Sequence, residues 1–253
     1  MAGAKGREIR LSTDTALLKV IAMLSMVIDH VGKMFFPGMP WMRLAGRLAF
    51  PLFAYCIAAG CVYTKNPLRY ALRVLVLALV SQPIYVLALG HVSGAMQAAV
   101  AGGLTVRGGL YWYVSSLETA NILFTLLPGI LIIWSLQEKR YIATGLVALA
   151  VWYFSPSINY GWRGVALILL FWALIDRPLP SLFWTGGFMA WWAITGGTGY
   201  HIGPIGFGIQ GYALLALPLI YLPVKTGIKI PKWFFYAFYP LHLLVIYLVL
   251  QLG

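Results

Sequence analysis

The chain has 253 residues, of which 61% are hydrophobic and only 9% are charged, and its mean hydropathy is +0.85. Soluble domains usually carry about a quarter charged residues, so this composition excludes an ordinary soluble enzyme and indicates a helical protein that crosses a membrane several times. The formal charge of +12 is scattered between apolar runs and forms no single basic stripe, which argues against a nucleic-acid partner.

Apolar segments follow one another along the whole chain, each bounded by charged residues, glycine or proline. They are 17–36, 42–63, 68–90, 119–136, 141–155, 163–176, 181–195, 208–224 and 233–252. Several are shorter than the roughly 20 residues of a straight span, and 91–116 leaves room for a half-helix, so eight or ten spans are also compatible. We expect an all-α fold, a polytopic transmembrane helical bundle of about nine spans that forms one membrane domain over residues 1–253.

The lysines and arginines of the connections predict the orientation in the lipid bilayer. With nine spans, one side receives eleven of them: Lys5, Arg7, Arg10, Lys65, Arg69, Lys139, Arg140, Arg177, Lys225, Lys229 and Lys232. The other side receives four: Lys33, Arg43, Arg107 and Arg163. Because basic connections stay in the cytoplasm, this bias predicts a cytoplasmic N-terminus and an outer C-terminus. The basic start is not read as a signal peptide, since the apolar run behind it contains Asp29 and His30 and lacks a cleavage site.

The first apolar segment carries ionisable residues on one helical face. Lys19, Met23, Met26 and His30 share that face, with the lysine and the histidine about 16 Å apart along the axis. An ionisable group in hydrocarbon costs roughly 2.5 to 3.5 kcal/mol, so we interpret this side as a working face. Asp29 lies about 100° around the helix from His30 and is not expected to orient it; its partner is either Lys33 or Arg47.

The second apolar segment carries Arg43 and Arg47 four residues apart, with Arg47 about 6 Å deeper in the membrane. Pro51 frees a backbone carbonyl near Arg47, so either a plain ion pair with Asp29 or a polar cavity explains this arginine. The two cysteines, Cys56 and Cys61, are five residues apart on one helix, which suits neither a disulfide nor a metal site. We assign them to packing.

Two further segments carry polar residues at depth. Arg69 and Arg73 are again four apart, with Lys65 before them; membrane anchoring explains Lys65 and Arg69, whereas Arg73, one turn deeper, also suits a phosphorylated ligand. Near the C-terminus, His242 lies about 14 Å along its segment from Trp233, close to mid-bilayer. It either bonds to the carbonyl freed by Pro240 or faces a cavity.

Five ordered blocks resemble the TraX family over nearly the whole chain. They are Lys19 with His30 eleven residues on, 46–54 (GRLAFPLFA), 121–129 (NILFTLLPG), 160–164 (YGWRG) and 234–243 (FFYAFYPLHL). The family is named for a conjugative-plasmid protein that acetylates the N-terminus of F-type pilin, and it is similar to the wider integral-membrane acyltransferase superfamily.

This resemblance implies a multi-pass acetyltransferase of the bacterial cytoplasmic (inner) membrane that uses acetyl-CoA. Lys19 and His30 match the catalytic signature of the superfamily, a basic residue followed by a histidine after ten intervening residues. The third helix of the superfamily often bears two arginines three apart, whereas Arg69 and Arg73 are four apart here. Asn121 and Tyr160 stand in the matching blocks, and we expect them to line a substrate cavity together with Arg43 and His242.

Acyl transfer chemistry assigns roles to these residues. Removing a proton from the acceptor needs a base, which we assign to His30, and the thioester oxyanion needs a donor, which we assign to Arg47; Asp29 and Lys19 complete the catalytic group. Acetyl-CoA is anionic, and we expect Lys65, Arg69, Arg73 and Arg140 to hold its phosphates. No metal site is expected. The acceptor is a pilin or other peptide amine, a saccharide hydroxyl or another small molecule.

Two other function classes remain open. A transporter or flippase of an anionic lipid or sugar intermediate also needs arginines and a histidine inside the membrane, and such proteins usually show inverted repeats, which this sequence does not. A purely structural protein of a pilus or secretion assembly gives no reason for Lys19 and His30 to share one face.

Overall fold

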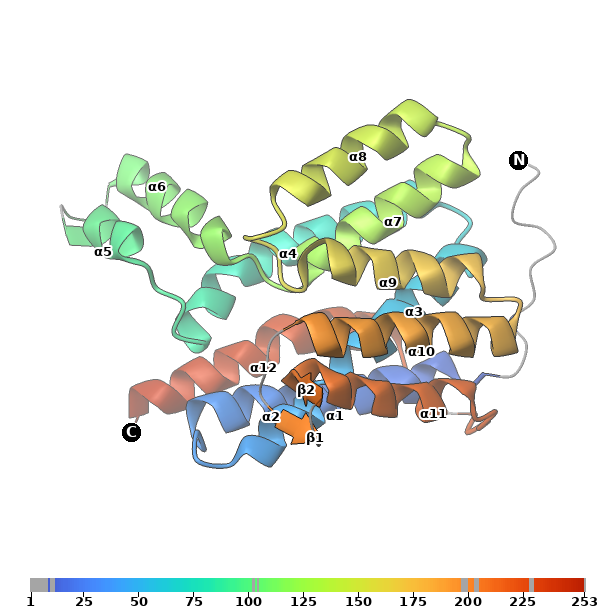
Figure 1. The fold of residues 1–253 in the computed structure, drawn as a ribbon. Coiled ribbons are helices and arrows are strands. Elements are labelled where there is room, and N and C mark those ends of the chain that lie inside the picture. Colours follow the sequence, from blue (N-terminus) through green and yellow to red (C-terminus); the bar gives the residue numbers. More distant parts are fainter. Residues whose placement is uncertain are drawn as a thin grey trace.

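The computed structural model describes residues 9, 12–101, 103, 105–196, 200–202, 205–227 and 230–252, which form a helical bundle with one small pair of strands (Figure 1). The helices are α1 (Thr15–Met34), α2 (Pro40–Gly46), α3 (Ala49–Tyr63), α4 (Pro67–Ala88), α5 (Gly94–Ala101), α6 (Val106–Ser116), η1 (Leu117–Thr119), α7 (Leu123–Gln137), α8 (Tyr141–Tyr153), α9 (Gly161–Ala173), α10 (Pro178–Thr195), η2 (Ile209–Leu215), α11 (Ala216–Tyr221) and α12 (Lys232–Leu252). Strands β1 (Tyr200–Ile202) and β2 (Ile205–Phe207) pair antiparallel, with His201 opposite Gly206.

Every predicted apolar segment is helical over most of its length. Four stretches are long and apolar enough to cross a membrane: Thr15–Met34, Pro40–Tyr63, Pro67–Ala88 and Trp233–Leu252. Shorter apolar helices follow at Leu123–Gln137, Tyr141–Tyr153, Gly161–Ala173 and Ile209–Tyr221. The all-α membrane bundle is therefore confirmed, and nine crossings stay a prediction.

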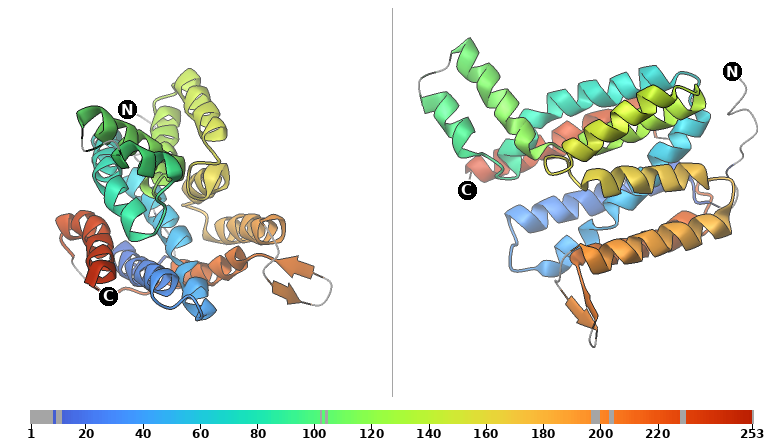
Figure 2. Two further views of the ribbon diagram at one scale, coloured as in Figure 1. Left: turned by 90° about the vertical axis from the view of Figure 1, so that its left-hand side faces the viewer. Right: turned by 45° about the horizontal axis from the view of Figure 1, so that its top comes forward.

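One region agrees with an option that the sequence left open, and one differs from the expectation. Residues 91–116, which left room for a half-helix, form the short helices α5 and α6, which contact each other and project from the bundle (Figure 2). The strands β1 and β2 project from the bundle beside α10, in a connection where the all-α expectation foresaw no strand (Figure 2). Three-residue strands are too short to show an alternating pattern in the sequence.

The second apolar segment is broken into α2 and α3 at Arg47 and Leu48. Pro51 has no backbone N–H, so the carbonyl of Arg47 cannot accept the helical hydrogen bond from the residue four positions on. At the same residue the helix tightens, since the backbone N–H of Arg47 donates to the carbonyl of Leu44 three residues back, at 3.0 Å. The proline thus places Arg47 at a break, where its side chain leaves the regular helical surface.

Helix α3 forms the centre of the bundle. It packs against α1, α7 and α9, and it is the most buried of the four long apolar stretches. Small side chains at Ala54, Ala58 and Ala59 are fully buried and let neighbouring helices approach closely. This packing fixes α1 and α7 at the positions where they border the cavity described below.

The connections alternate between two ends of the bundle (Figure 1). At the end where α1 begins, here called the N-terminal end, the carboxylate of Asp14 accepts from the backbone N–H groups of Thr226 at 2.8 Å and Gly227 at 3.3 Å. These donors hold the pKa of Asp14 below its ordinary value. The amide of Gln137 reaches the carbonyl of Cys61 at the same end, at 3.5 Å.

The basic connections assigned to the cytoplasm lie at this N-terminal end wherever the structure describes them, whereas the connection 155–162 lies at the opposite end (Figure 1). Lys5, Arg7, Arg10 and Lys229 are outside the described residues. The separation of the two loop sets agrees with the predicted topology, and the cytoplasmic assignment of the N-terminal end rests on the charge bias.

Candidate functional site

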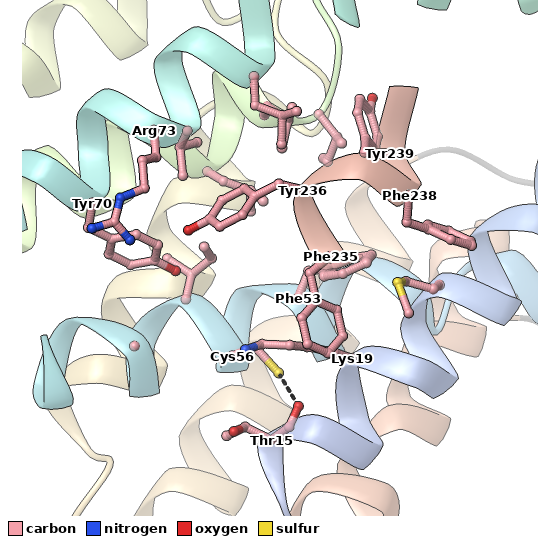
Figure 3. A pocket seen from close by; sticks show the side chains of 18 of the residues that line it. Thr15, Lys19, Phe53, Cys56, Tyr70, Arg73, Phe235, Tyr236, Phe238 and Tyr239 are labelled. Atoms are coloured by element: carbon pink, nitrogen blue, oxygen red, sulfur yellow. Dashed lines mark hydrogen bonds between the residues drawn. The ribbon is translucent and has the colours of Figure 1, made fainter. Parts of the chain in front are cut away.

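The predicted working face of α1 borders a cavity of about 570 Å³ between α1, α3, α4, α7 and α12 (Figure 3). Lys19, Met23 and Met26 line it, and both methionines are buried. His30 follows one turn beyond Met26 on the same face. The cavity therefore extends from near the N-terminal end toward the histidine.

The cavity wall is mainly apolar and aromatic and carries two cations, Lys19 and Arg73. Its aromatic members are Phe53, Tyr63, Tyr70, Phe235, Tyr236, Phe238 and Tyr239. The ammonium of Lys19 lies 5.0 Å from the centre of the Phe235 ring. Figure 3 shows Arg73 beside Tyr70, with the hydroxyl of Tyr236 directed toward them. Among described residues, neither cation forms an ion pair with a carboxylate, so both charges are available to an anionic ligand.

His30 forms a direct hydrogen bond with His242 of α12. Nδ1 of His30 lies 3.1 Å from Nε2 of His242, and Nδ1 of His242 lies 2.9 Å from the carbonyl oxygen of Phe238. The two imidazole rings are nearly parallel, 12° apart, with centroids separated by 5.3 Å. The sequence offered two alternatives for His242, a carbonyl bond or a cavity position. Its carbonyl partner is that of Phe238 and not that of Tyr236, which Pro240 frees.

Asp29 pairs with both arginines of the second segment. Its Oδ2 is 2.7 Å from Nη1 of Arg43, and its Oδ1 is 2.7 Å from Nη2 of Arg47. Nε of Arg47 also donates to the backbone carbonyl of Arg43, at 3.2 Å. Of the two partners proposed for Asp29, Arg47 is therefore the one found, joined by Arg43. Buried charges require such partners, because an unpaired charge in this environment is costly.

Gly46 makes this ion-pair cluster possible. A Cβ atom at this position would overlap Asp29 of α1, so only glycine lets α2 approach α1 closely enough for the arginines to reach the carboxylate. Gly32 of α1 is similarly close to α2, since its Cβ would lie 2.5 Å from that of Met42. The two glycines thus set the helix separation that the cluster needs.

Lys33 turns away from Asp29 toward the connection after α4. Its ammonium donates to the carbonyl of Leu89 at 2.9 Å and lies 3.0 Å from Nε2 of His91. Tyr85 stacks on the His91 ring with centroids 5.5 Å apart. Burial and the neighbouring Lys33 lower the pKa of His91 below its ordinary value. These contacts join the end of α1 to α4.

One protein-family model matches nearly the whole chain. The family model described as "TraX protein" matches residues 14–250. The chain belongs to the TraX family. The resemblance inferred from the five ordered sequence blocks is thereby confirmed, and the match includes every helix of the bundle up to the last two residues of α12.

Two curated proteins are similar to parts of the chain. A probable fimbrial assembly protein FimC of Dichelobacter nodosus is 29% identical over 120 residues, which are 45% of this chain and 43% of that protein. An uncharacterized protein RP591 of Rickettsia prowazekii is 41% identical over 51 residues, 20% of each chain. The matches thus span less than half the length of these relatives. No solved structure matches the chain significantly.

The remaining residues expected at the donor site lie at the N-terminal end, outside the cavity wall. Lys65 and Arg69 are exposed, and the backbone N–H of Arg69 donates to the side chain of Asn66, which caps α4. Arg140 is exposed and lies over the ring of Trp134 at 5.3 Å. Of the four expected phosphate ligands, the structure brings only Arg73 to the cavity.

Tyr160 and Asn121 also lie outside the cavity wall. Tyr160 has a left-handed backbone (φ 63°) before α9; it stacks on Phe50 with centroids 4.0 Å apart and interacts electrostatically with Arg47. The amide of Asn121 donates to the carbonyl of Ala78 at 2.9 Å and to the side chain of Gln82 at 2.9 Å, and it accepts from the start of α7. Tyr160 thus belongs with the ion-pair cluster, and Asn121 joins α4 to α7.

Sequence reasoning did not foresee the contact between the two histidines or the link from Lys33 to His91. Each pair is distant in sequence, and no spacing rule predicts such a contact. One signal existed for the histidines, since both lie at similar depth in segments predicted to run in the same direction.

Proposed function

We propose that this protein is a membrane acetyltransferase that moves the acetyl group of acetyl-CoA to an amine or hydroxyl acceptor. The observation that carries the proposal is the cavity. It has cations near the N-terminal end, an apolar wall along α1, and a histidine one turn beyond its deepest α1 residue, Met26. This order of groups suits a ligand with an anionic head and a long arm.

The choice of acetyl-CoA as acyl donor rests on its negative charge and on the length of its pantetheine arm. A guanidinium binds phosphate through several N–H donors, and Arg73 stands on the cavity wall with the ammonium of Lys19. An extended pantetheine arm follows the wall past Met23 and Met26 and brings the thioester toward His30. With the N-terminal end cytoplasmic, acetyl-CoA binds from the compartment that contains it.

Acetyl transfer then uses His30 as the general base. The acceptor nitrogen or oxygen attacks the thioester carbonyl while its proton passes to a ring nitrogen of His30. The C–S bond breaks, coenzyme A leaves as the thiolate, and the proton held by His30 neutralises that thiolate. The proposed transfer needs no cofactor besides acetyl-CoA as the acyl donor.

Arg47 is proposed to stabilise the oxyanion of the tetrahedral intermediate. Its Nε and Nη2 are engaged by Arg43 and Asp29, and Nη1 has no hydrogen-bond partner among the described residues. A guanidinium has five N–H donors, so donors remain for a developing negative charge. Asp29 would then hold Arg47 in place.

The acceptor is proposed to be a surface appendage protein or a cell-surface saccharide. The TraX family resemblance points to a pilin amine, and one curated relative is named as a probable fimbrial assembly protein. His30 lies in the half of the bundle away from the basic end, where an acceptor outside the cytoplasm can approach.

Transfer from labelled donor tests the proposal. Purified protein in detergent would be incubated with acetyl-labelled acetyl-CoA and either a pilin-like peptide with a free N-terminus or an oligosaccharide. We expect label on one acceptor and release of free coenzyme A in equal amount. Transport of an anionic substrate in vesicles without any acetylated product would overturn the assignment.

A further inference from the structure

We propose that His242 is a positioning residue that fixes the tautomer of His30, so that Nε2 of His30 is the atom that accepts the proton of the acceptor. The inference rests on the proposed acetyl transfer and specifies how its base is arranged. It is carried by the continuous chain of hydrogen bonds from His30 through His242 to the Phe238 carbonyl.

The direction of these bonds follows from the carbonyl. An oxygen of a carbonyl only accepts, so the contact of 2.9 Å with Phe238 places the proton of His242 on Nδ1. Nε2 of a neutral His242 then carries a lone pair and accepts. Nδ1 of His30, 3.1 Å away, must donate to it, and this leaves the lone pair of His30 on Nε2.

The ring geometry supports a directed bond between the histidines. The planes differ by 12°, and a centroid separation of 5.3 Å together with a nitrogen–nitrogen distance of 3.1 Å places the two facing nitrogens between the rings, so the rings meet through their nitrogens. The ring centroid of His242 is 5.2 Å from that of Phe238 and 5.5 Å from that of Tyr239. These aromatic neighbours restrict rotation of His242 and hold its Nε2 toward His30.

Among the described residues, no carboxylate takes the place of His242 beside His30. The one adjacent in sequence, Asp29, is engaged by Arg43 and Arg47. The other charged groups around His30 are the cations Lys33, Arg43 and Arg47. Among described residues, His242 is the hydrogen-bond partner of His30, and both nitrogens of His242 are occupied whereas His30 keeps Nε2 for chemistry.

The same bond assists the reaction step. When Nε2 of His30 takes the proton of the acceptor, the ring becomes an imidazolium and its Nδ1–H bond to His242 becomes charge-assisted and stronger. His242 thus stabilises the charge that develops on the base without itself exchanging a proton. This is the part that an orienting carboxylate has in a catalytic triad.

Two substitutions separate positioning from packing. His242→Gln keeps a donor for Phe238 and an acceptor for His30, whereas His242→Phe keeps an aromatic ring but offers no acceptor. We expect kcat to fall about 100-fold or more in His242→Phe and by about tenfold or less in His242→Gln, with the KM for acetyl-CoA nearly unchanged in both. His91→Phe is the matched control, since His91 contacts Lys33 and not His30. If His242→Phe retains more activity than His242→Gln, the ring matters for packing and the inference is overturned.

A spectroscopic readout tests the tautomer without any activity. In protein labelled with ¹⁵N-histidine, we expect His30 to show a protonated Nδ1 and an unprotonated Nε2, and the ring to lose this single-tautomer pattern in His242→Phe. The signals would be assigned by the loss of His30 in His30→Gln. The opposite tautomer in the wild type would overturn the inference whatever the variants do. A wild type that has this tautomer but acetylates no acceptor would refute the proposed function and leave the assignment of the tautomer standing.

Discussion

The cavity between α1, α4 and α12 and the polar cluster around Asp29 use the same residue types in opposite ways. In the cluster, one carboxylate binds two guanidinium groups at 2.7 Å each, so both arginines have a counter-ion while the cluster keeps one net positive charge. In the cavity, Lys19 and Arg73 face an apolar, aromatic wall and have no carboxylate partner among the described residues. The paired charges of the cluster hold α1 and α2 together, whereas Lys19 and Arg73 can pair with the negative charge of a ligand.

The contrast also divides α1 by function. Its turns up to Met26 line the cavity, through Lys19, Met23 and Met26, and the following turn anchors the cluster through Asp29. His30, next to Asp29 in the sequence and one turn beyond Met26, is bonded to neither an acid nor a cavity cation, but to His242. We therefore expect three kinds of effect. Substitutions in the cavity should weaken binding of the acyl donor, substitutions in the Asp29 cluster should lower the stability of the fold, and substitution of His30 should lower the turnover number.

The largest effect on acetyl transfer is expected for substitution of His30. His30→Ala should lower kcat for acetyl transfer by about 10²- to 10⁴-fold, because the acceptor loses its general base. Binding of acetyl-CoA should persist, since the phosphates contact the other end of the cavity. Wild type and variant would be compared in the same detergent, with thermal melting as the folding control. Transfer at the wild-type rate by His30→Ala would make His30 a structural histidine.

The next effect is on stability and belongs to the cluster. Asp29→Asn leaves two guanidinium groups without their counter-charge, and breaking a buried pair in this way typically costs about 3 to 5 kcal/mol. We expect a clear drop in the melting temperature in detergent. Glu138→Gln is the control, because Glu138 is exposed and its carboxylate forms no ion pair with a described residue. Equal melting of the two variants would contradict the structural role of the cluster.

A smaller effect is expected for the cavity cation Arg73. Arg73→Ala should raise the KM for acetyl-CoA about tenfold with little change in kcat, because phosphate contacts bind ground and transition states alike. Arg69→Ala is its matched control, since Arg69 is one turn away on α4 and equally exposed but outside the cavity wall. Calorimetry with desulfo-coenzyme A measures both affinities. If Arg69→Ala weakens binding as much as Arg73→Ala, the phosphates lie outside the cavity.

The mildest substitutions test which end of the bundle faces the cytoplasm. Single cysteines at Glu138 and Pro156, both exposed, should react with a membrane-impermeant thiol reagent from opposite sides. Pro156→Cys should label in intact cells and Glu138→Cys only after the membrane is opened. The native Cys56 and Cys61 are buried and give a low background. Labelling of both positions from one side would refute the predicted topology.

The sequence predicted most of the fold, because membrane helices are identified by local hydrophobicity. Segments such as 68–90 and 233–252 agree with α4 and α12 within a few residues. Three of the four residues predicted to share one face of α1, Lys19, Met23 and Met26, line the cavity, and the fourth, His30, lies one turn beyond its wall. Periodicity does not say what a face contacts, so the α12 aromatic wall opposite it required the structure.

The site was predicted less completely than the fold, because it depends on contacts between distant segments. His30 and His242 are 212 residues apart, and their hydrogen bond depends on how α1 and α12 pack. Arg69 and Arg73 look equivalent in the sequence, and only the position of the cavity separates them. Asn121, expected in a cavity, instead accepts from the backbone N–H of Leu123 at the start of α7 and donates to α4; its place just before a helix start was the available signal.

The structure of the complex with bound acetyl-CoA tests the central claim most directly, that the cavity leads the donor to His30. We predict that the phosphates contact Arg73 and Lys19 near the N-terminal end and that the arm passes Met23 and Met26. The thioester carbonyl should then lie close enough to Nε2 of His30 for a single acceptor nitrogen or oxygen to contact both. Acetyl-CoA bound elsewhere, with this cavity empty or its thioester directed away from His30, would contradict the account.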